Sequence, residues 1–166
     1  MSLLLAGSLS AKSTTEKAGD VFAALLPLGA YAATLYLHDK DGQYQFYKSY
    51  GTALASTYLL KYTVKEKRPD SDKEDSFPSA HTSSSFSGAT FIHRRYGLKY
   101  AIVPYMAALF TGYSRVDANR HHTHDVIAGA LIGIISSWYF TDRYKNLDIK
   151  PVISTNYKGL QISYRY

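Results

Sequence analysis

Three short polar clusters in the middle of the chain hold the residues most able to do chemistry. They are Lys61 with Arg68-Pro69, then Pro78-Ser79-Ala80-His81, and then Ser114-Arg115 with His121 and Asp125. Their side chains include cations that attract anions, a hydroxyl that donates a hydrogen bond, two imidazoles that titrate near neutral pH, and one carboxylate. These residue types favour a site that binds an anionic group and transfers protons.

Each cluster taken alone has an ordinary structural explanation. A lysine and an arginine near a helix end usually cap carbonyl groups or face solvent, and Pro78-Ser79 is typical of a helix N-cap. His121 and Asp125, four residues apart on a helix, form a surface pair more often than a catalytic dyad. The combination is harder to explain in this way, because all of these groups occur together in one order and spacing.

The three clusters resemble the signature of the type 2 phosphatidic acid phosphatase superfamily, which includes bacterial nonspecific acid phosphatases and vanadium haloperoxidases. The family pattern is Lys-six residues-Arg-Pro, Pro-Ser-Gly-His, and Ser-Arg-five residues-His-three residues-Asp. All three parts occur here in order, between Lys61 and Asp125. Ala80 departs from the pattern, because the family usually has glycine there. An alanine is tolerated at a helical φ but strained at a positive φ.

The phosphate-binding groups suggested by this pattern match the charge of a phosphoryl group in transfer. Such a group spreads negative charge over its oxygens, and positive charge and hydrogen-bond donors placed around it stabilise the transition state. The predicted phosphate-binding residues are Lys61, Arg68, Ser79, Ala80 and Arg115. Ala80 and His81 would contribute backbone N–H groups at the start of a helix, where anions bind readily.

The resemblance also implies the catalytic roles. His121 is expected to attack phosphorus and form a phosphohistidine that water hydrolyses. Asp125 is expected to orient the His121 ring, and His81 to act as the general acid that protonates the leaving oxygen. Phosphatase chemistry of this kind requires no metal ion and no other cofactor.

Two further histidines, His122 and His124, form a dense imidazole cluster with His121 and raise the question of zinc or copper. The chain has no cysteine, and the sequence shows no well-placed additional carboxylate. We therefore expect no metal and place both residues at the helix start or behind the catalytic groups.

Helix-like apolar spacing predicts an all-α fold, a compact bundle of about five to six helices. The expected helices lie in 21–37, 44–64, 81–94, 99–113 and 123–140, with Arg68-Pro69 ending the second. The helical phosphatase domain would span 12–148. Segment 1–11 resembles a signal-peptide remnant or a disordered N-terminus, and tail 149–166 suggests a small β-hairpin around 156–159. The acidic loop 70–75 is either a gate over the pocket or a solvated connector.

Composition narrows the possible partners. With 46% hydrophobic and 19% charged residues the chain can fold, and its net charge of +6 favours anionic partners. The 16 tyrosines suit a lipid interface. No uncharged segment reaches the roughly 18 to 20 residues expected of a transmembrane helix, and the mean hydropathy is −0.21. An interfacial or shallowly inserted protein fits these features.

The leading functional hypothesis is a phosphatase of the bacterial cell envelope, facing the periplasm, that acts on a lipid phosphate or diphosphate at a membrane surface. Candidate substrates are phosphatidic acid, phosphatidylglycerol phosphate, an isoprenyl diphosphate or a lipid A headgroup. Alternatives are a soluble periplasmic nonspecific acid phosphatase acting on small phosphate esters, a vanadate-dependent haloperoxidase, and a noncatalytic membrane-binding module. The sequence shows no nucleic-acid motif, so we expect no nucleic-acid partner. The substrate headgroup and the oligomeric state stay open.

Overall fold

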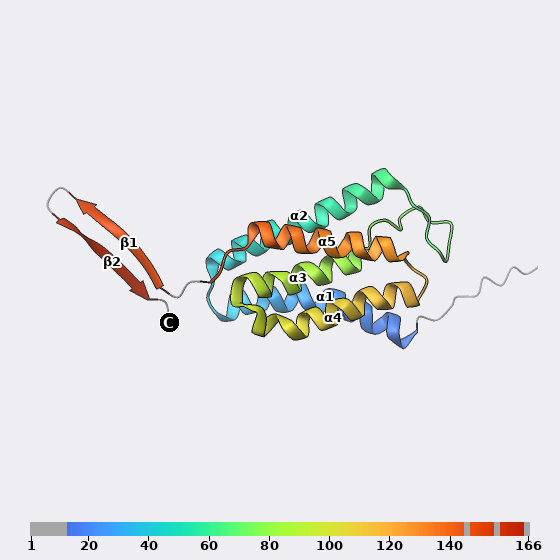
Figure 1. Cartoon of the computed structure of the whole chain (residues 1–166), viewed down its shortest axis with the longest axis horizontal. Helices are drawn as coiled ribbons and strands as arrows, with labels where there is room; N and C mark the ends of the chain where they lie inside the picture. Colours follow the sequence, from blue (N-terminus) through green and yellow to red (C-terminus); the bar gives the residue numbers. More distant parts are fainter. Residues whose placement is uncertain (1–12, 145–146, 155–156, 165–166) are drawn as a thin grey trace, which may run out of the picture.

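The computed structural model describes residues 13–144, 147–154 and 157–164, so the expected N-terminal segment 1–11 lies outside the described residues. The described part contains helices α1 (Thr14–Tyr36), α2 (Lys40–Val64), α3 (Ala80–Tyr96), α4 (Leu98–Asp117) and α5 (Thr123–Phe140), followed by strands β1 (Leu147–Ser154) and β2 (Tyr157–Tyr164). The predicted all-α bundle is confirmed (Figure 1).

The helices run alternately in opposite directions, which brings distant parts of the sequence to one end of the bundle (Figure 1). At that end lie the last turns of α2 and α4, which carry Lys61 and Arg115. The first turns of α3 and α5 lie there too, with Ser79 and His122 as their N-caps. The three polar clusters therefore meet at one end of the fold.

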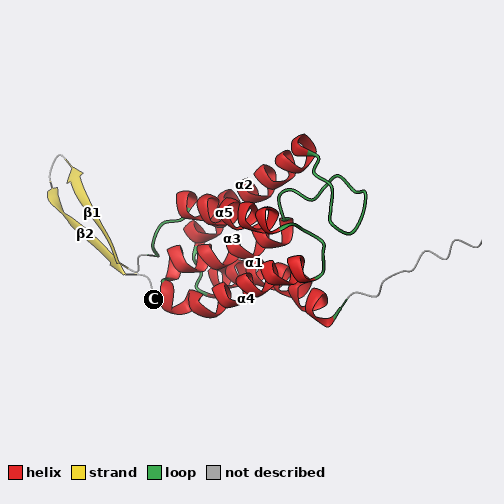
Figure 2. Ribbon diagram, turned by 45° about the vertical axis from the view of Figure 1, so that its right-hand side comes forward, coloured by secondary structure: helices red, strands yellow, loops and turns green. Residues whose placement is uncertain are grey.

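Helix α3 forms the centre of the bundle and packs against each of the other four helices (Figures 1 and 2). Its residues 82–91 are all buried, and most of them are serine, threonine, glycine or alanine. Their hydroxyls bond between helices: Thr57 Oγ1 donates to Ser83 Oγ at 2.8 Å, and the Ser87 and Ser137 hydroxyls lie 2.9 Å apart. Small bonded hydroxyls therefore replace large apolar groups in the core.

Two glycines of α5 allow its backbone to approach α3. A Cβ atom at Gly129 would lie 2.4 Å from the Ser79 carbonyl oxygen, and one at Gly133 would lie 2.4 Å from the Ser83 carbonyl oxygen. Both distances are shorter than any non-bonded contact allows. These two glycines therefore permit the close packing of α5 against α3.

The outer faces of the bundle carry the large apolar side chains. Among the described residues, the buried hydrophobic set consists of alanines plus Phe46, Phe86 and Phe91. The exposed ones on three helices include Val21, Leu25, Leu28, Ile102, Val103, Met106, Leu109, Ile127, Leu131 and Ile135. An apolar exterior around a hydroxyl-rich interior inverts the pattern of a water-soluble bundle and favours a lipid environment.

Helix α1 is also, within the described residues, the one helix long and apolar enough to cross a membrane. It begins at Thr14, well before the uncharged segment 21–37 from which no such helix was expected. Buried helices of soluble proteins and signal sequences satisfy the same criterion. The exposed apolar faces of α4 and α5 are therefore the stronger evidence for contact with lipid.

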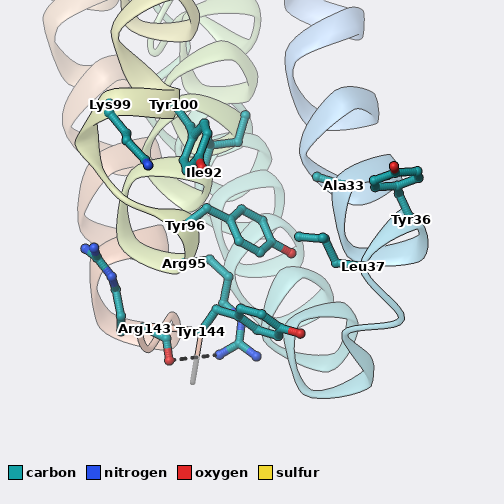
Figure 3. A pocket seen from close by; sticks show the side chains of 10 residues that line it. All are labelled: Ala33, Tyr36, Leu37, Ile92, Arg95, Tyr96, Lys99, Tyr100, Arg143 and Tyr144. Carbon is teal, nitrogen blue, oxygen red and sulfur yellow. Dashed lines mark hydrogen bonds between the residues drawn. The ribbon is translucent and has the colours of Figure 1, made fainter. Parts of the chain in front are cut away.

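An ion pair fastens the end of the bundle opposite to the polar clusters. The buried guanidinium of Arg95 binds both carboxylate oxygens of Asp39, at 2.5 and 2.7 Å, and the Tyr96 hydroxyl donates to the same carboxylate at 3.1 Å. Arg95 also donates to the Arg143 carbonyl. Both residues and Tyr144 line a hollow of about 610 Å³ (Figure 3). These contacts tie the α1–α2 turn to the end of α3.

Most predicted boundaries agree with the structure, and α5 agrees at both ends. Helix α2 ends at Val64 as predicted, but Lys65, in a left-handed conformation with φ 49°, ends it, so the prediction that Arg68-Pro69 does so is wrong. Helix α4 continues to Asp117 and so contains Arg115 in its last turn. The predicted hairpin is present, with β1 and β2 antiparallel and Ser154 opposite Tyr157.

The close approach of α5 to α3 predicts that Gly129→Ala is destabilising. A methyl group at Gly129 would collide with the Ser79 backbone, and such overpacking costs about 1–3 kcal/mol. Gly51→Ala is the matched control, because nothing lies within 4 Å of its added Cβ and alanine favours a helix. Thermal unfolding in detergent should show a lower melting temperature for Gly129→Ala alone. Equal stability of both variants would contradict the packing described.

Candidate active site

The imidazole of His121 is buried just before α5 and faces a carboxylate on one side. Its Nδ1 atom lies 3.6 Å from Asp125 Oδ2 and 3.5 Å from the Ser76 hydroxyl. The Ser76 hydroxyl donates to Asp125 Oδ2 at 2.5 Å. The expected pairing of His121 with Asp125 thus runs through Ser76 rather than through a short direct bond. With Nδ1 on this side of the ring, Nε2 is the nitrogen left for chemistry.

Asp125 is fully buried and joins three parts of the site. Besides the Ser76 hydroxyl, its Oδ2 atom accepts the backbone N–H of His122 at 2.8 Å, which closes the first turn of α5. Its backbone carbonyl accepts the Ser79 N–H at 3.0 Å. One residue therefore fixes the start of α5, the start of α3 and the loop that carries Ser76.

The surroundings of His121 favour its neutral form. Burial and then the positive charges of Lys61 and Arg68 lower the pKa of His121 to about 4, although the Asp125 carboxylate acts in the opposite direction. A neutral imidazole has an unprotonated ring nitrogen at neutral pH, which a nucleophile needs.

Lys61 and Arg68 fasten the loop between α2 and α3. The Lys61 ammonium donates to the Asp75 carbonyl at 2.5 Å and lies 3.3 Å from the Ser76 carbonyl. Arg68 binds both carboxylate oxygens of Asp75, at 2.6 and 3.1 Å, and its hydrogen bond lowers the pKa of that carboxyl. Because Ser76 contacts Asp125, the first cluster is linked to the third through this loop.

The second cluster begins α3. Ser79 is buried, accepts a hydrogen bond from Thr82 Oγ1 at 3.0 Å, and makes no side-chain cap to the helix. The first-turn N–H groups of a helix have no acceptor within it and suit an anion. Ala80 opens the helix with ordinary backbone geometry, and the positive-φ non-glycine residues among those described lie elsewhere. Alanine in place of the family's glycine is therefore accommodated without strain.

His81 and Arg115 are joined by an acid from α1 that the sequence analysis missed. Asp20 Oδ1 lies 3.1 Å from His81 Nε2 and 2.7 Å from Arg115 Nη1. Arg115 also donates to the Glu16 carbonyl at 2.6 Å. Gly19 permits this, since a Cβ there would lie 2.8 Å from Arg115 Nη2. The sequence does hold a signal for this acid: Glu16 and Asp20 lie four residues apart at the start of a largely apolar helix.

A shallow hollow of about 300 Å³ lies beside His81 and Asp20. Its lining residues belong to helices α1, α2 and α3, whose arrangement is shown in Figure 1. His81 and Asp20 lie on it, and the rest of its wall is largely apolar: Ala23, Ala24, Tyr50, Leu54, Tyr58, Ala80 and Ser84. The site residues therefore border a surface that can hold an apolar chain. A second hollow, of about 390 Å³, includes Lys61 and lies beside the loop.

His122 and His124 lie next to these groups, together with a carboxylate that the sequence analysis missed. His124 Nε2 is 2.6 Å from Glu66 Oε1, and the two imidazole rings are stacked at 5.1 Å. The expectation that no well-placed additional carboxylate exists is wrong, because the loop after α2 places Glu66 against the start of α5. His122 is the N-cap of α5, as expected of a helix-start residue.

Comparisons with known proteins identify the family of this chain. The family model described as PAP2 superfamily matches residues 44–148. The lipid A 1-phosphatase of Porphyromonas gingivalis is 42% identical over 78 residues, which is 45% of this chain and 18% of that protein. The lipid A 4'-phosphatase of Helicobacter pylori is 38% identical over 95 residues, 56% of this chain and 48% of that protein. The chain thus spans less than half the length of either relative.

A solved structure is similar as well. The crystal structure of Aquifex aeolicus LpxE superposes with a TM-score of 0.57 and 26% sequence identity, over 73% of this chain and 84% of that one. The matched family region includes all three polar clusters and most of the contacts described above.

His81 is the expected general acid, so its contact with Asp20 predicts that Asp20→Asn impairs proton transfer by His81. The negative charge that stabilises a protonated His81 is lost, and general acid catalysis contributes about 10²–10⁴-fold to rates. We expect kcat to fall about 10²-fold on an alkyl phosphate and far less on a phosphate ester with a good leaving group. Asp72→Asn, an exposed acid in the loop, is the control. An equal loss on both substrates would indicate a structural role only.

Proposed function

Because the chain belongs to the PAP2 superfamily, we propose that it is a phosphatase that removes phosphate from a lipid through a phosphohistidine intermediate, without a metal ion. The observation that carries the proposal is the placement of His121, whose Nδ1 faces Ser76 and Asp125 while Lys61 and Arg68 lie near enough to act on its pKa. A nucleophile with an oriented ring beside fixed cations is what phosphoryl transfer requires.

In the first proposed step, His121 Nε2 forms a bond to phosphorus while the bond between phosphorus and the leaving oxygen breaks. The electron pair of that bond goes to the oxygen, which takes a proton from His81. The positive charge that builds on the His121 ring is stabilised by Asp125 through the Ser76 hydroxyl. Asp20 stabilises the protonated form of His81 before the transfer.

In the second proposed step, water attacks phosphorus and His81 accepts its proton. The phosphorus–nitrogen bond breaks, its electron pair returns to Nε2, and phosphate leaves. Lys61, Arg68 and Arg115 would offset the charge on the phosphoryl oxygens in both steps, and Ser79 with the first N–H groups of α3 would donate hydrogen bonds.

A lipid substrate is supported by three independent features. The two curated relatives described above are named as lipid A phosphatases. The outer faces of α1, α4 and α5 are apolar. The hollow beside His81 is lined mainly by apolar atoms, so an acyl chain could lie there with its phosphate toward the histidine. A soluble acid phosphatase is not favoured, because its surface would not carry this apolar exterior.

Membrane association follows from the same apolar faces and is part of the proposal. The placement of the site on the periplasmic side of a bacterial envelope, and the boundaries of the helical phosphatase domain at 12 and 148, remain predictions. Protease accessibility of the 65–79 loop in sealed vesicles of known orientation tests the side of the membrane.

The proposed function predicts a preference for lipid phosphates that depends on His121. Wild-type protein should release phosphate from lipid A and from phosphatidic acid in mixed micelles at least about tenfold faster than from a water-soluble ester of equal concentration. His121→Ala should abolish release from all three. The exposed His38→Asn, at the opposite end of the bundle, should behave as wild type, because asparagine tolerates the positive φ of this position. Equal rates on soluble and micellar substrates would contradict the lipid assignment, and an active His121→Ala would contradict the mechanism.

A further inference from the structure

Four potential metal ligands meet beside the catalytic groups: Glu66, His122, His124 and Asp125. They come from two separate parts of the fold, the loop after α2 and the first turn of α5. One ligand atom from each lies within 4.8 Å of all the others. None of them except Asp125 takes part in the proposed phosphoryl transfer.

Three distances within this cluster are close to those of a tetrahedral metal site. With zinc–ligand distances of about 2.0–2.1 Å, neighbouring ligand atoms of a tetrahedron lie about 3.3–3.4 Å apart. His122 Nδ1 is 3.4 Å from Asp125 Oδ2 and 3.5 Å from Glu66 Oε1. His124 Nε2 is 3.3 Å from Asp125 Oδ1. The pair of His124 and Glu66, at 2.6 Å, would have to separate for both to bind one ion.

A second observation points to a ligand at the same place. Asp125 is fully buried, yet no residue that the structure describes forms a hydrogen bond with its Oδ1 atom or with His122 Nδ1. His124 Nε2 lies 3.3 Å from Asp125 Oδ1 without making a hydrogen bond. Unpaired buried polar atoms are costly, and both of these atoms belong to the cluster. A cation would satisfy both.

We propose that Glu66, His122, His124 and Asp125 form an inhibitory site for a divalent transition-metal cation of the Zn²⁺ type. Two imidazoles and two carboxylates suit zinc, whereas Mg²⁺ and Ca²⁺ prefer oxygen ligands alone. The side chains of His122 and His124 are 39% and 58% exposed, so a cation can enter from solvent.

Inhibition follows from the shared carboxylate and rests on the proposed function. Asp125 supports the His121 ring through Ser76. A cation bound to Asp125 would compete for this carboxylate and oppose the positive charge that forms on His121 when phosphorus is attacked. It would also link the Glu66 loop to the start of α5.

Calorimetric titration of the full-length protein with ZnCl₂ in detergent tests the site without any substrate. The wild type should bind one zinc ion per chain and bind Mg²⁺ far more weakly. Glu66→Gln and His124→Gln should each weaken zinc binding at least about tenfold, whereas Glu74→Gln, an exposed acid of the same loop, should not. Absence of zinc binding, or equal binding by all variants, would overturn the site.

Phosphatase assays on the same proteins test the inhibition. In chelator, Glu66→Gln and His124→Gln should be as active as wild type, and added zinc should inhibit the wild type reversibly but the two variants much less. Zinc that binds without inhibiting, or that restores activity lost in chelator, would overturn the inhibitory role. Zinc binding by a wild type that is inactive in chelator would support the site and contradict the proposed function.

Discussion

The hydrogen bonds of the buried Asp125 carboxylate hold the other groups of the site in position. A carboxylate in a protein interior is stable only when it is hydrogen-bonded or paired, and here the partners come from separate segments. Ser76 belongs to the loop after α2, His122 begins α5, and the Asp125 carbonyl accepts the N–H of Ser79 at the start of α3. Satisfying one residue thus aligns a loop and two helix starts around His121.

This alignment requires helices that approach closely, and the interior of the bundle is built for it. Gly129 and Gly133 bring α5 against the backbone of α3, and buried serines and threonines bond between helices where larger side chains would hold them apart. The large apolar residues are displaced to the outside as a result. The close approach of the helices therefore accounts for both the compact polar core and the apolar exterior. Both features suit a protein at a lipid surface.

The sequence predicted the helices and the three clusters because each leaves a local signal, namely apolar periodicity or a fixed spacing within a few residues. It could not reveal the partners that bridge these clusters. Asp20 reaches His81 and Arg115 from α1, and Ser76 and Glu66 lie in a loop whose path depends on tertiary contacts. No local pattern sets that path. The end of α2 at Val64 agrees with the prediction, but its cause does not: the left-handed backbone of Lys65 ends the helix before Arg68-Pro69 is reached.

Asp125 and Ser76 lie on the Nδ1 side of His121, and the proposed mechanism therefore has Nε2 attack phosphorus. The most direct measurement is the identity of the phosphorylated nitrogen, obtained by rapid quenching with a lipid phosphate under alkaline conditions, followed by peptide mapping and phosphorus–nitrogen correlation in NMR. The structure predicts phosphate on Nε2 of His121. Phosphate on Nδ1 of His121, on His81, or on no histidine would contradict this mechanism.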